Sequence, residues 1–181
     1  MSGAKTLIAL TAMFACAVLS ARCYGAEPGG DKAVETRYAT VYAPDRGALI
    51  SFGRKIGAIT FFNREDGKSE ELIGERIDEI VGRVRTRLDM YPGGLSFSIR
   101  IFPTYVEIQA AYAAFGGVQK PPIAFYSHKV KGIYVSLPDL TDGVLAHEIA
   151  HAVICFYFVT PPPGKMQEIL AQYVDRHLWD N

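Results

Sequence analysis

The sequence is poor in cysteine, and this excludes a disulfide-stabilised fold. Three cysteines occur in 181 residues, and two of them, Cys16 and Cys23, lie in an N-terminal segment that we expect to be removed. The mature chain then keeps only Cys155, so no disulfide forms within one molecule even in an oxidising compartment. Cys155 lies in an apolar stretch, where we interpret it as a small buried hydrophobic residue.

The chain also lacks an excess of charge of either sign and an apolar run long enough to cross a membrane. Its 19 basic and 19 acidic residues cancel, so no basic surface is predicted for nucleic acid. A membrane-spanning helix needs about 20 apolar residues, and the uninterrupted apolar run at residues 6–19 is shorter. We therefore expect no nucleic-acid partner and no stable membrane span in the mature chain.

The N-terminus has the features of a secretory signal peptide. Lys5 precedes the apolar run, and small residues follow it at positions 20–26. We expect residues 1–26 to be cleaved, with an uncleaved anchor as the alternative, and the protein to be secreted or periplasmic. Residues 27–35 are polar and rich in glycine, and are expected to form a loose leader to a single domain at residues 36–181.

Hydrophobic periodicity beyond the leader predicts an α+β domain. Residues 69–90 repeat apolar side chains at spacings of three and four, which is typical of an amphipathic helix. Residues 46–62 fit a strand or a helix, and we favour a helix capped by Asp45. The other predicted elements are strands at 36–44, 95–103, 123–127 and 132–138, and helices at 104–115, 143–159 and 165–179. Thr104 and Glu107 predict a capping box for the helix at 104–115, and either Thr141 or Asp142 is expected to cap the helix at 143–159.

The predicted helix at residues 143–159 is apolar apart from three ionisable side chains and one tyrosine. His147, Glu148 and His151 form the pattern HExxH. Burying such groups without partners costs several kcal/mol, so something must bind them. On a helix, positions i and i+4 share one face, and two imidazoles so placed can bind one Zn²⁺. Glu148 points towards the same cleft and can act as a general base. The alternative is a pair of hydrogen-bonded core histidines.

A catalytic zinc needs a third protein ligand and an open coordination position. Glu168 follows His151 by 17 positions, after a connection that is interrupted by prolines at 161–163. A second helix packed back against the first would bring this carboxylate to the two imidazoles. Taken alone, Glu168 is better explained as an exposed carboxylate in the first turn of a helix, where acidic residues are favoured.

The whole pattern resembles the gluzincin metallopeptidases, and most closely their small peptidase MA-like domains. The matching residues are His147, Glu148, Ile149, Ala150, His151, Pro163, Glu168, Ala171 and Tyr173. The resemblance implies zinc ligands at His147, His151 and Glu168. It also implies a zincin-like core with a small mixed sheet, whose edge strand beside the HExxH helix is residues 132–138. An extended peptide substrate would then contact Gly132 and Tyr134 on that strand.

The sequence departs from the family pattern near the third ligand. Ile169 replaces the usual glycine after the glutamate, and Lys165 replaces an aromatic residue. The larger family members carry a further helical domain, whereas this chain ends 13 residues after Glu168. We therefore expect half of the substrate cleft to be missing or to be supplied by a partner subunit.

Two further roles remain to be assigned, and the spacing of residues bears only on the first. Asp175 lies seven positions after Glu168, on the same helix face, and is a candidate to orient a ligand imidazole as a hydrogen-bond acceptor. Hydrolysis also needs a donor for the oxyanion of the tetrahedral intermediate. The candidates are Tyr173, His128, Tyr134 and Tyr157.

The sequence thus predicts a secreted zinc metallopeptidase, in which a zinc-activated water attacks a peptide bond with Glu148 as general base. The alternative is a zinc-stabilised, zincin-like binding module without efficient proteolysis. An intramembrane protease is excluded, because the apolar helix is too short and carries three ionisable groups.

Overall fold

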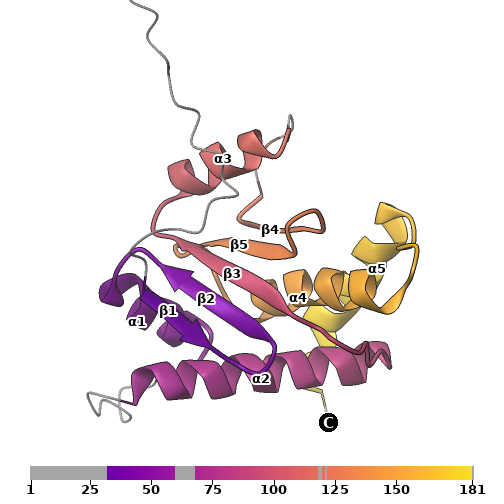
Figure 1. Cartoon of the computed structure of the whole chain (residues 1–181), viewed down its shortest axis with the longest axis horizontal. Coiled ribbons are helices and arrows are strands. Elements are labelled where there is room, and N and C mark those ends of the chain that lie inside the picture. The colour runs from indigo at the N-terminus through magenta and orange to yellow at the C-terminus, as the bar shows by residue number, and fades with distance from the viewer. Residues whose placement is uncertain (1–31, 60–67, 118–119, 121, 181) are drawn as a thin grey trace, which may run out of the picture.

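A mixed β-sheet organises the part of the chain that the computed structural model describes, residues 32–59, 68–117, 120 and 122–180 (Figure 1). Five strands are found within these residues, in the order β1-β2-β3-β5-β4. The central pairs β2–β3 and β3–β5 are parallel, and the outer pairs β1–β2 and β4–β5 are antiparallel. The strands are β1 (Lys32–Glu35), β2 (Ala39–Ala43), β3 (Phe97–Phe102), β4 (Ala124–Ser127) and β5 (Gly132–Ser136).

Five helices accompany the sheet among the described residues, and the predicted α+β class with a small mixed sheet is confirmed. The zincin-like character of the core stays a prediction. None of the helices in these residues is long and apolar enough to cross a membrane. The helices are α1 (Arg46–Lys55), α2 (Ser69–Leu88), α3 (Tyr105–Ala114), α4 (Asp142–Tyr157) and α5 (Gly164–His177).

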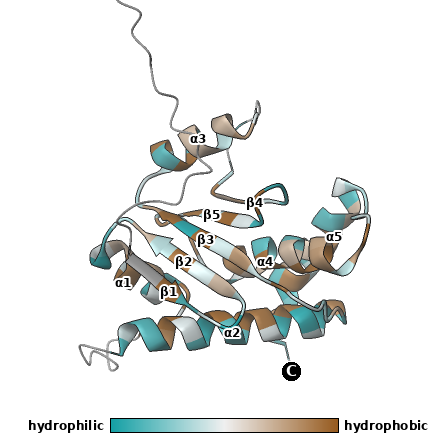
Figure 2. Ribbon diagram, in the orientation of Figure 1, coloured by the Kyte–Doolittle hydropathy of each residue, from teal (hydrophilic) through white to brown (hydrophobic). Residues whose placement is uncertain are grey.

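The two faces of the sheet are covered by different helices, because alternate residues of a strand point to opposite faces. One set of strand residues packs into the main core with α1, α2, α4 and α5; it includes Ile99, Ile101, Ile133 and Val135. The other set packs with α3 in a separate small cluster; it includes Phe102, Tyr134 and Phe125. Figure 1 shows α3 on one side of the sheet and α1, α2 and α4 on the other. Along α2, apolar and polar residues alternate as expected of a helix with one buried face (Figure 2).

Three of the helices, α1, α3 and α4, begin directly after a residue whose side chain caps them. The Asp45 carboxylate accepts from the backbone N–H of Ala48 at the start of α1, which confirms the choice of a helix there. Thr104 and Glu107 form the reciprocal capping box of α3. Thr141 caps α4, where its hydroxyl accepts from the N–H of Val144 at 3.1 Å.

Two expectations about strands are wrong. Lys32–Glu35, which we expected to belong to a loose leader, is strand β1, because its backbone pairs with β2 and Val34 is buried. The strand expected at residues 132–138 is not at an edge: β5 lies between β3 and β4, and all five of its residues are buried. The edge strand beside α4 is β4. The predicted signal peptide lies outside the described residues.

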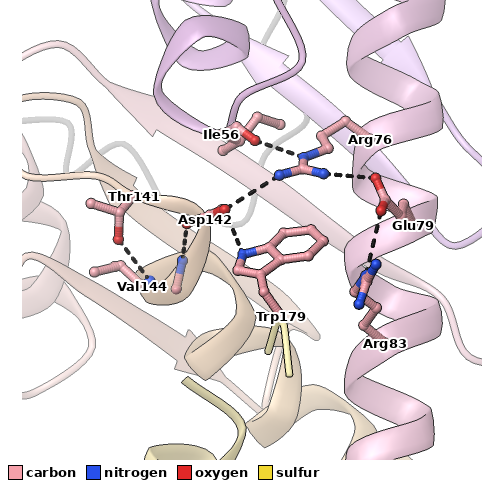
Figure 3. A network of polar contacts seen from close by, with 9 residues as sticks. Ile56, Arg76, Glu79, Arg83, Thr141, Asp142, Val144 and Trp179 are labelled. Atoms are coloured by element: carbon pink, nitrogen blue, oxygen red, sulfur yellow. Dashed lines mark hydrogen bonds and ion pairs between the residues drawn. The ribbon is translucent and has the colours of Figure 1, made fainter. Parts of the chain in front are cut away.

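A polar cluster around Trp179 joins the beginning of α4, the segment after α5, and α2 (Figure 3). The indole lies between the guanidinium groups of Arg76 and Arg83, 4.2 and 4.3 Å from the ring centroid. Its N–H donates to Asp142 at 2.9 Å, and Arg76 donates to the same carboxylate oxygen at 3.3 Å. Arg76 also donates to the Ile56 carbonyl at 2.8 Å, which adds the end of α1. The cluster therefore holds α5 antiparallel to α4 at a defined position along its length.

We expect the Trp179→Ala variant to lower the free energy of unfolding by about 2 kcal/mol, since it removes two cation–π contacts and one hydrogen bond to a carboxylate. Trp179→Phe keeps the ring and should lose about half as much. Urea unfolding followed by far-UV circular dichroism measures both. Tyr157→Ala, at a 49% exposed tyrosine, is the matched control. Equal unfolding midpoints for Trp179→Ala and the control would contradict the role given to the cluster.

Candidate metal centre

Three ligand-type side chains from α4 and α5 converge at one point. The Nε2 atom of His147 lies 3.3 Å from one carboxylate oxygen of Glu168, and the Nε2 atom of His151 lies 3.3 Å from the other. The ligand atoms of all three lie within 4.8 Å of one another. This group could hold a metal ion.

The local sequence explains how the three meet. His147 and His151 are one turn apart on α4, and their rings lie 5.1 Å apart. The helix ends at Tyr157, and the prolines at 161–163 prevent its continuation. The chain then turns back as α5, which begins at Gly164 and carries Glu168 in its second turn. The predicted return of a second helix against the first is therefore confirmed.

The spacing of these atoms is compatible with one bound metal ion. Each imidazole lies 3.3 Å from a different carboxylate oxygen of Glu168, and one ligand atom from each of the three residues lies within 4.8 Å of the others. The Glu168 side chain is 53% exposed, whereas those of His147 and His151 are 20% and 13% exposed. A metal ion at this position would therefore be bound by the two imidazoles on its buried side and would remain accessible to solvent on the side of Glu168.

Gln167 orients His151, a role that the sequence had suggested for Asp175. The Gln167 side-chain N–H donates to the Pro162 carbonyl at 2.8 Å, which fixes the amide with its oxygen towards His151. That oxygen lies 3.4 Å from His151 Nδ1. Because an amide oxygen only accepts, Nδ1 must carry the proton. The lone pair of Nε2 is then directed to the metal position.

The electrostatics of the site favour a neutral imidazole at His151. Burial lowers the pKa of this histidine, and the nearby His147 acts in the same direction, although Glu168 and Gln167 oppose them. A neutral imidazole is the form that binds metals. His151 is therefore ready to bind without first losing a proton at neutral pH.

Glu148 lies beside the ligands but is not one of them. It is only 8% exposed and accepts a hydrogen bond from the backbone N–H of Tyr126 in β4. Burial raises the pKa of its carboxyl group to about 8, and the negative charge of Glu168 adds to the rise. In the metal-free protein Glu148 therefore holds a proton near neutral pH, as a group poised for acid–base exchange does.

A cavity of about 530 Å³ opens beside the three donors. It crosses the outer edge of β4 and so reaches both faces of the sheet, from α4 to α3. Its lining comes from α3, the β4 region, α4 and α5: Tyr112, Pro122, Ala124, Phe125, Tyr126, His128, His147, Glu148, His151, Cys155, Pro161, Gln167 and Glu168.

Several residues proposed from the sequence are not brought to this cavity. Gly132 and Tyr134 lie in the interior strand β5, and Tyr134 is 1% exposed. Tyr173 is 47% exposed on α5 and contacts the His177 ring. Asp175 lies against Gly143 at the beginning of α4, and no hydrogen bond joins it to either imidazole among the described residues. Of the four candidate oxyanion donors, His128 lines the cavity.

Cys155 is closer to the site than its apolar context suggested. It lies one turn after His151, is partly exposed to the cavity, and its thiol faces the Gln167 oxygen at 3.7 Å. Burial raises the pKa of the thiol, so it stays protonated at neutral pH in the metal-free protein, and it is not one of the three clustered donors.

The residues that the sequence did not single out are Gln167, Tyr126, Phe125 and Tyr112. The only local signal for Gln167 is its position next to Glu168. The others depend on the strand order, which places β4 rather than β5 beside α4. The order of strands in a sheet cannot be predicted from the spacing of residues along the chain.

For the metal-free protein we expect Glu148→Gln to remove a pH dependence of stability. The pKa of Glu148 is higher in the folded protein than in the unfolded chain. Between pH 5 and 8 the folded protein therefore holds a proton that the unfolded chain has lost, and the free energy of unfolding of the wild type falls as pH rises. The variant should match wild type at pH 5 and exceed it by about 3 kcal/mol above pH 8. Urea unfolding with a chelator present measures the difference, with Glu75→Gln on α2 as control. Parallel pH profiles for wild type and Glu148→Gln would contradict this.

Comparisons with family models, with curated proteins and with solved structures find no match for this chain.

Proposed function

We propose that the protein is a zinc-dependent metallopeptidase. The observation that carries this proposal is the convergence of His147, His151 and Glu168, with the non-ligating Glu148 at their side. A structural metal site would be closed by a fourth protein ligand, whereas here three donors face an open cavity. An open position beside a buried carboxylate is what hydrolysis requires.

The donor set favours zinc over other common metals. Two imidazoles and one carboxylate match the His₂Glu combination of catalytic zinc sites. Calcium and magnesium prefer sets made of oxygen atoms only and six or more ligands.

Glu148 would move the protons during peptide hydrolysis. His147, His151 and Glu168 would hold the zinc ion, which would supply Lewis acidity towards a carbonyl oxygen and a water molecule. Glu148 would accept a proton from that water and then donate it to the leaving amine. Its raised pKa in the metal-free protein reflects burial and Glu168, and a nearby cation would lower it towards the range of a base.

The substrate would lie along β4, not along the strand first expected. Because the N–H of Tyr126 points to Glu148 and therefore away from β5, the backbone groups of Tyr126 and of Ala124 face the outer edge. An extended peptide can pair with such an edge by β-augmentation. Its backbone would then pass directly over the metal position and Glu148.

The alternative is a zinc-stabilised binding module, possessing the same donors without efficient proteolysis. It is favoured by apolar side chains that remain exposed on one side of α5 beside Glu168, namely Met166, Ile169 and Tyr173. A partner subunit covering this surface would complete the cleft. Glu148 distinguishes the two functions, since a binding module has no need of a proton acceptor there.

We expect the purified protein to bind about one zinc ion per chain and Glu168→Ala to lose most of it. Removal of one of three protein ligands should weaken the affinity by at least about 100-fold. Elemental mass spectrometry after dialysis against a weak chelator measures the metal content. Glu75→Ala, an exposed glutamate on α2, should retain zinc as wild type does. Wild-type protein without zinc after refolding in its presence would refute the metal site.

We expect Glu148→Gln to keep zinc and to lose peptide hydrolysis. Removing a general base lowers turnover by about 10²- to 10⁴-fold, while the three ligands are untouched. Cleavage of a mixed peptide library, followed by mass spectrometry, measures the activity. A variant with near wild-type cleavage would remove Glu148 from the mechanism. Absence of cleavage by the zinc-loaded wild type would favour the binding module.

A further inference from the structure

The cavity joins two chemically different surfaces across the edge of β4. On the α4 face it presents the ionisable groups of the metal centre. On the α3 face it presents the side chains of Tyr112, Pro122 and Phe125. Ala124 and Phe125 are consecutive in β4 and so point to opposite faces; the first packs in the main core and the second against the α3 cluster.

The surface on the α3 face consists of Tyr112, Pro122 and Phe125 and is called the aromatic wall below. The rings of Tyr112 and Phe125 meet edge to face with centroids 5.3 Å apart. Phe125 in turn stacks on the buried ring of Tyr134 at 4.7 Å, with the planes 6° apart. Gly117 lies so close to the Tyr112 ring that a Cβ there would overlap it. Contact with Tyr134 therefore restricts the Phe125 ring, and contact with Gly117 restricts the Tyr112 ring, so neither ring rotates freely.

This wall offers no partner for a negative charge. Its three cavity-lining residues are a tyrosine, a proline and a phenylalanine, and all the acidic and imidazole groups that line the cavity belong to α4, α5 or the turn after β4. A carboxylate placed against the wall would lose hydration without an ion pair, which is costly. An aromatic or large aliphatic side chain would instead bury apolar surface there.

We propose that Tyr112 and Phe125 form a substrate subsite that takes an aromatic or large aliphatic side chain and rejects acidic ones. The proposal rests on the peptidase function proposed above. An extended peptide paired with β4 directs alternate side chains to the two faces of the sheet. One residue then faces the metal, and its sequence neighbour meets the aromatic wall. Selectivity should therefore be concentrated at one position close to the scissile bond and be weak at the position next to it.

Cleavage-site profiling tests the subsite without assuming how the peptide is aligned. The zinc-loaded protein is incubated with a mixed peptide library, and the cleaved sequences are identified by mass spectrometry. Wild type should favour Phe, Tyr, Leu and Met over Asp and Glu by about tenfold at one position. Tyr112→Ala should reduce this preference to below about threefold, while Tyr112→Phe, which keeps the ring, should retain it. Tyr157→Ala, at an exposed tyrosine outside the cavity, should have the wild-type profile.

A binding measurement gives a second readout that does not need turnover. Zinc-loaded Glu148→Gln should bind a blocked alanine hexapeptide with one central phenylalanine about tenfold more tightly than the same peptide with aspartate. Adding Tyr112→Ala should remove the difference; far-UV circular dichroism and the fluorescence of Trp179 report whether the fold is retained.

The outcomes separate the two proposals. Cleavage without a preference for apolar residues, or with a preference that survives in Tyr112→Ala, overturns the subsite and leaves the peptidase intact. Zinc-loaded wild type that cleaves no library peptide, together with a Glu148→Gln variant that binds none, overturns both.

Discussion

The antiparallel packing of α5 on α4 is the constraint on which the site depends. The two imidazoles come from one helix and are brought together by its periodicity alone. The third donor must come from elsewhere, and two features place it: the proline-containing connection at residues 158–163 reverses the chain, and the cluster around Trp179 fixes the far end of α5. A shift of α5 by one residue would move Glu168 about 1.5 Å along α4, enough to destroy both 3.3 Å separations.

Burial has opposite consequences for the two kinds of polar group on α4. It lowers the pKa of His151 and so favours the neutral form that binds metal. It raises the pKa of Glu148 and so favours the protonated form. Each group has a protein partner even without a metal, since Gln167 contacts His151 and the Tyr126 amide contacts Glu148. An apolar helix can therefore carry these groups at a cost that their hydrogen bonds partly offset.

The sequence predicts what depends on local order and fails where the outcome depends on packing between distant segments. The capping residues Asp45, Thr104 and Thr141 predict the starts of three helices correctly, because a cap acts within four residues. Spacing on one helix face also suggested Asp175 as a neighbour of a ligand imidazole. Because α5 runs antiparallel to α4, the seven residues after Glu168 carry Asp175 about 10 Å towards the start of α4, past His147 and up to Gly143. The edge strand was misassigned for a similar reason: either strand of a hairpin can be outermost, and pairing of β5 with β3 decides it.

In the proposed peptidase, the position of β4 at the edge would separate the groups that act on the peptide bond from those that select the substrate. The metal donors and Glu148 lie on the α4 side of this strand, and the aromatic wall lies on the α3 side. The two surfaces come from different helices and belong to different packed clusters, so a substitution in one need not disturb the other. Substrate choice could therefore change through α3 and the first residues of β4 while the donor geometry stays the same. A displacement of β4 itself would affect both surfaces, because the Tyr126 N–H of that strand donates to Glu148, the proposed general base.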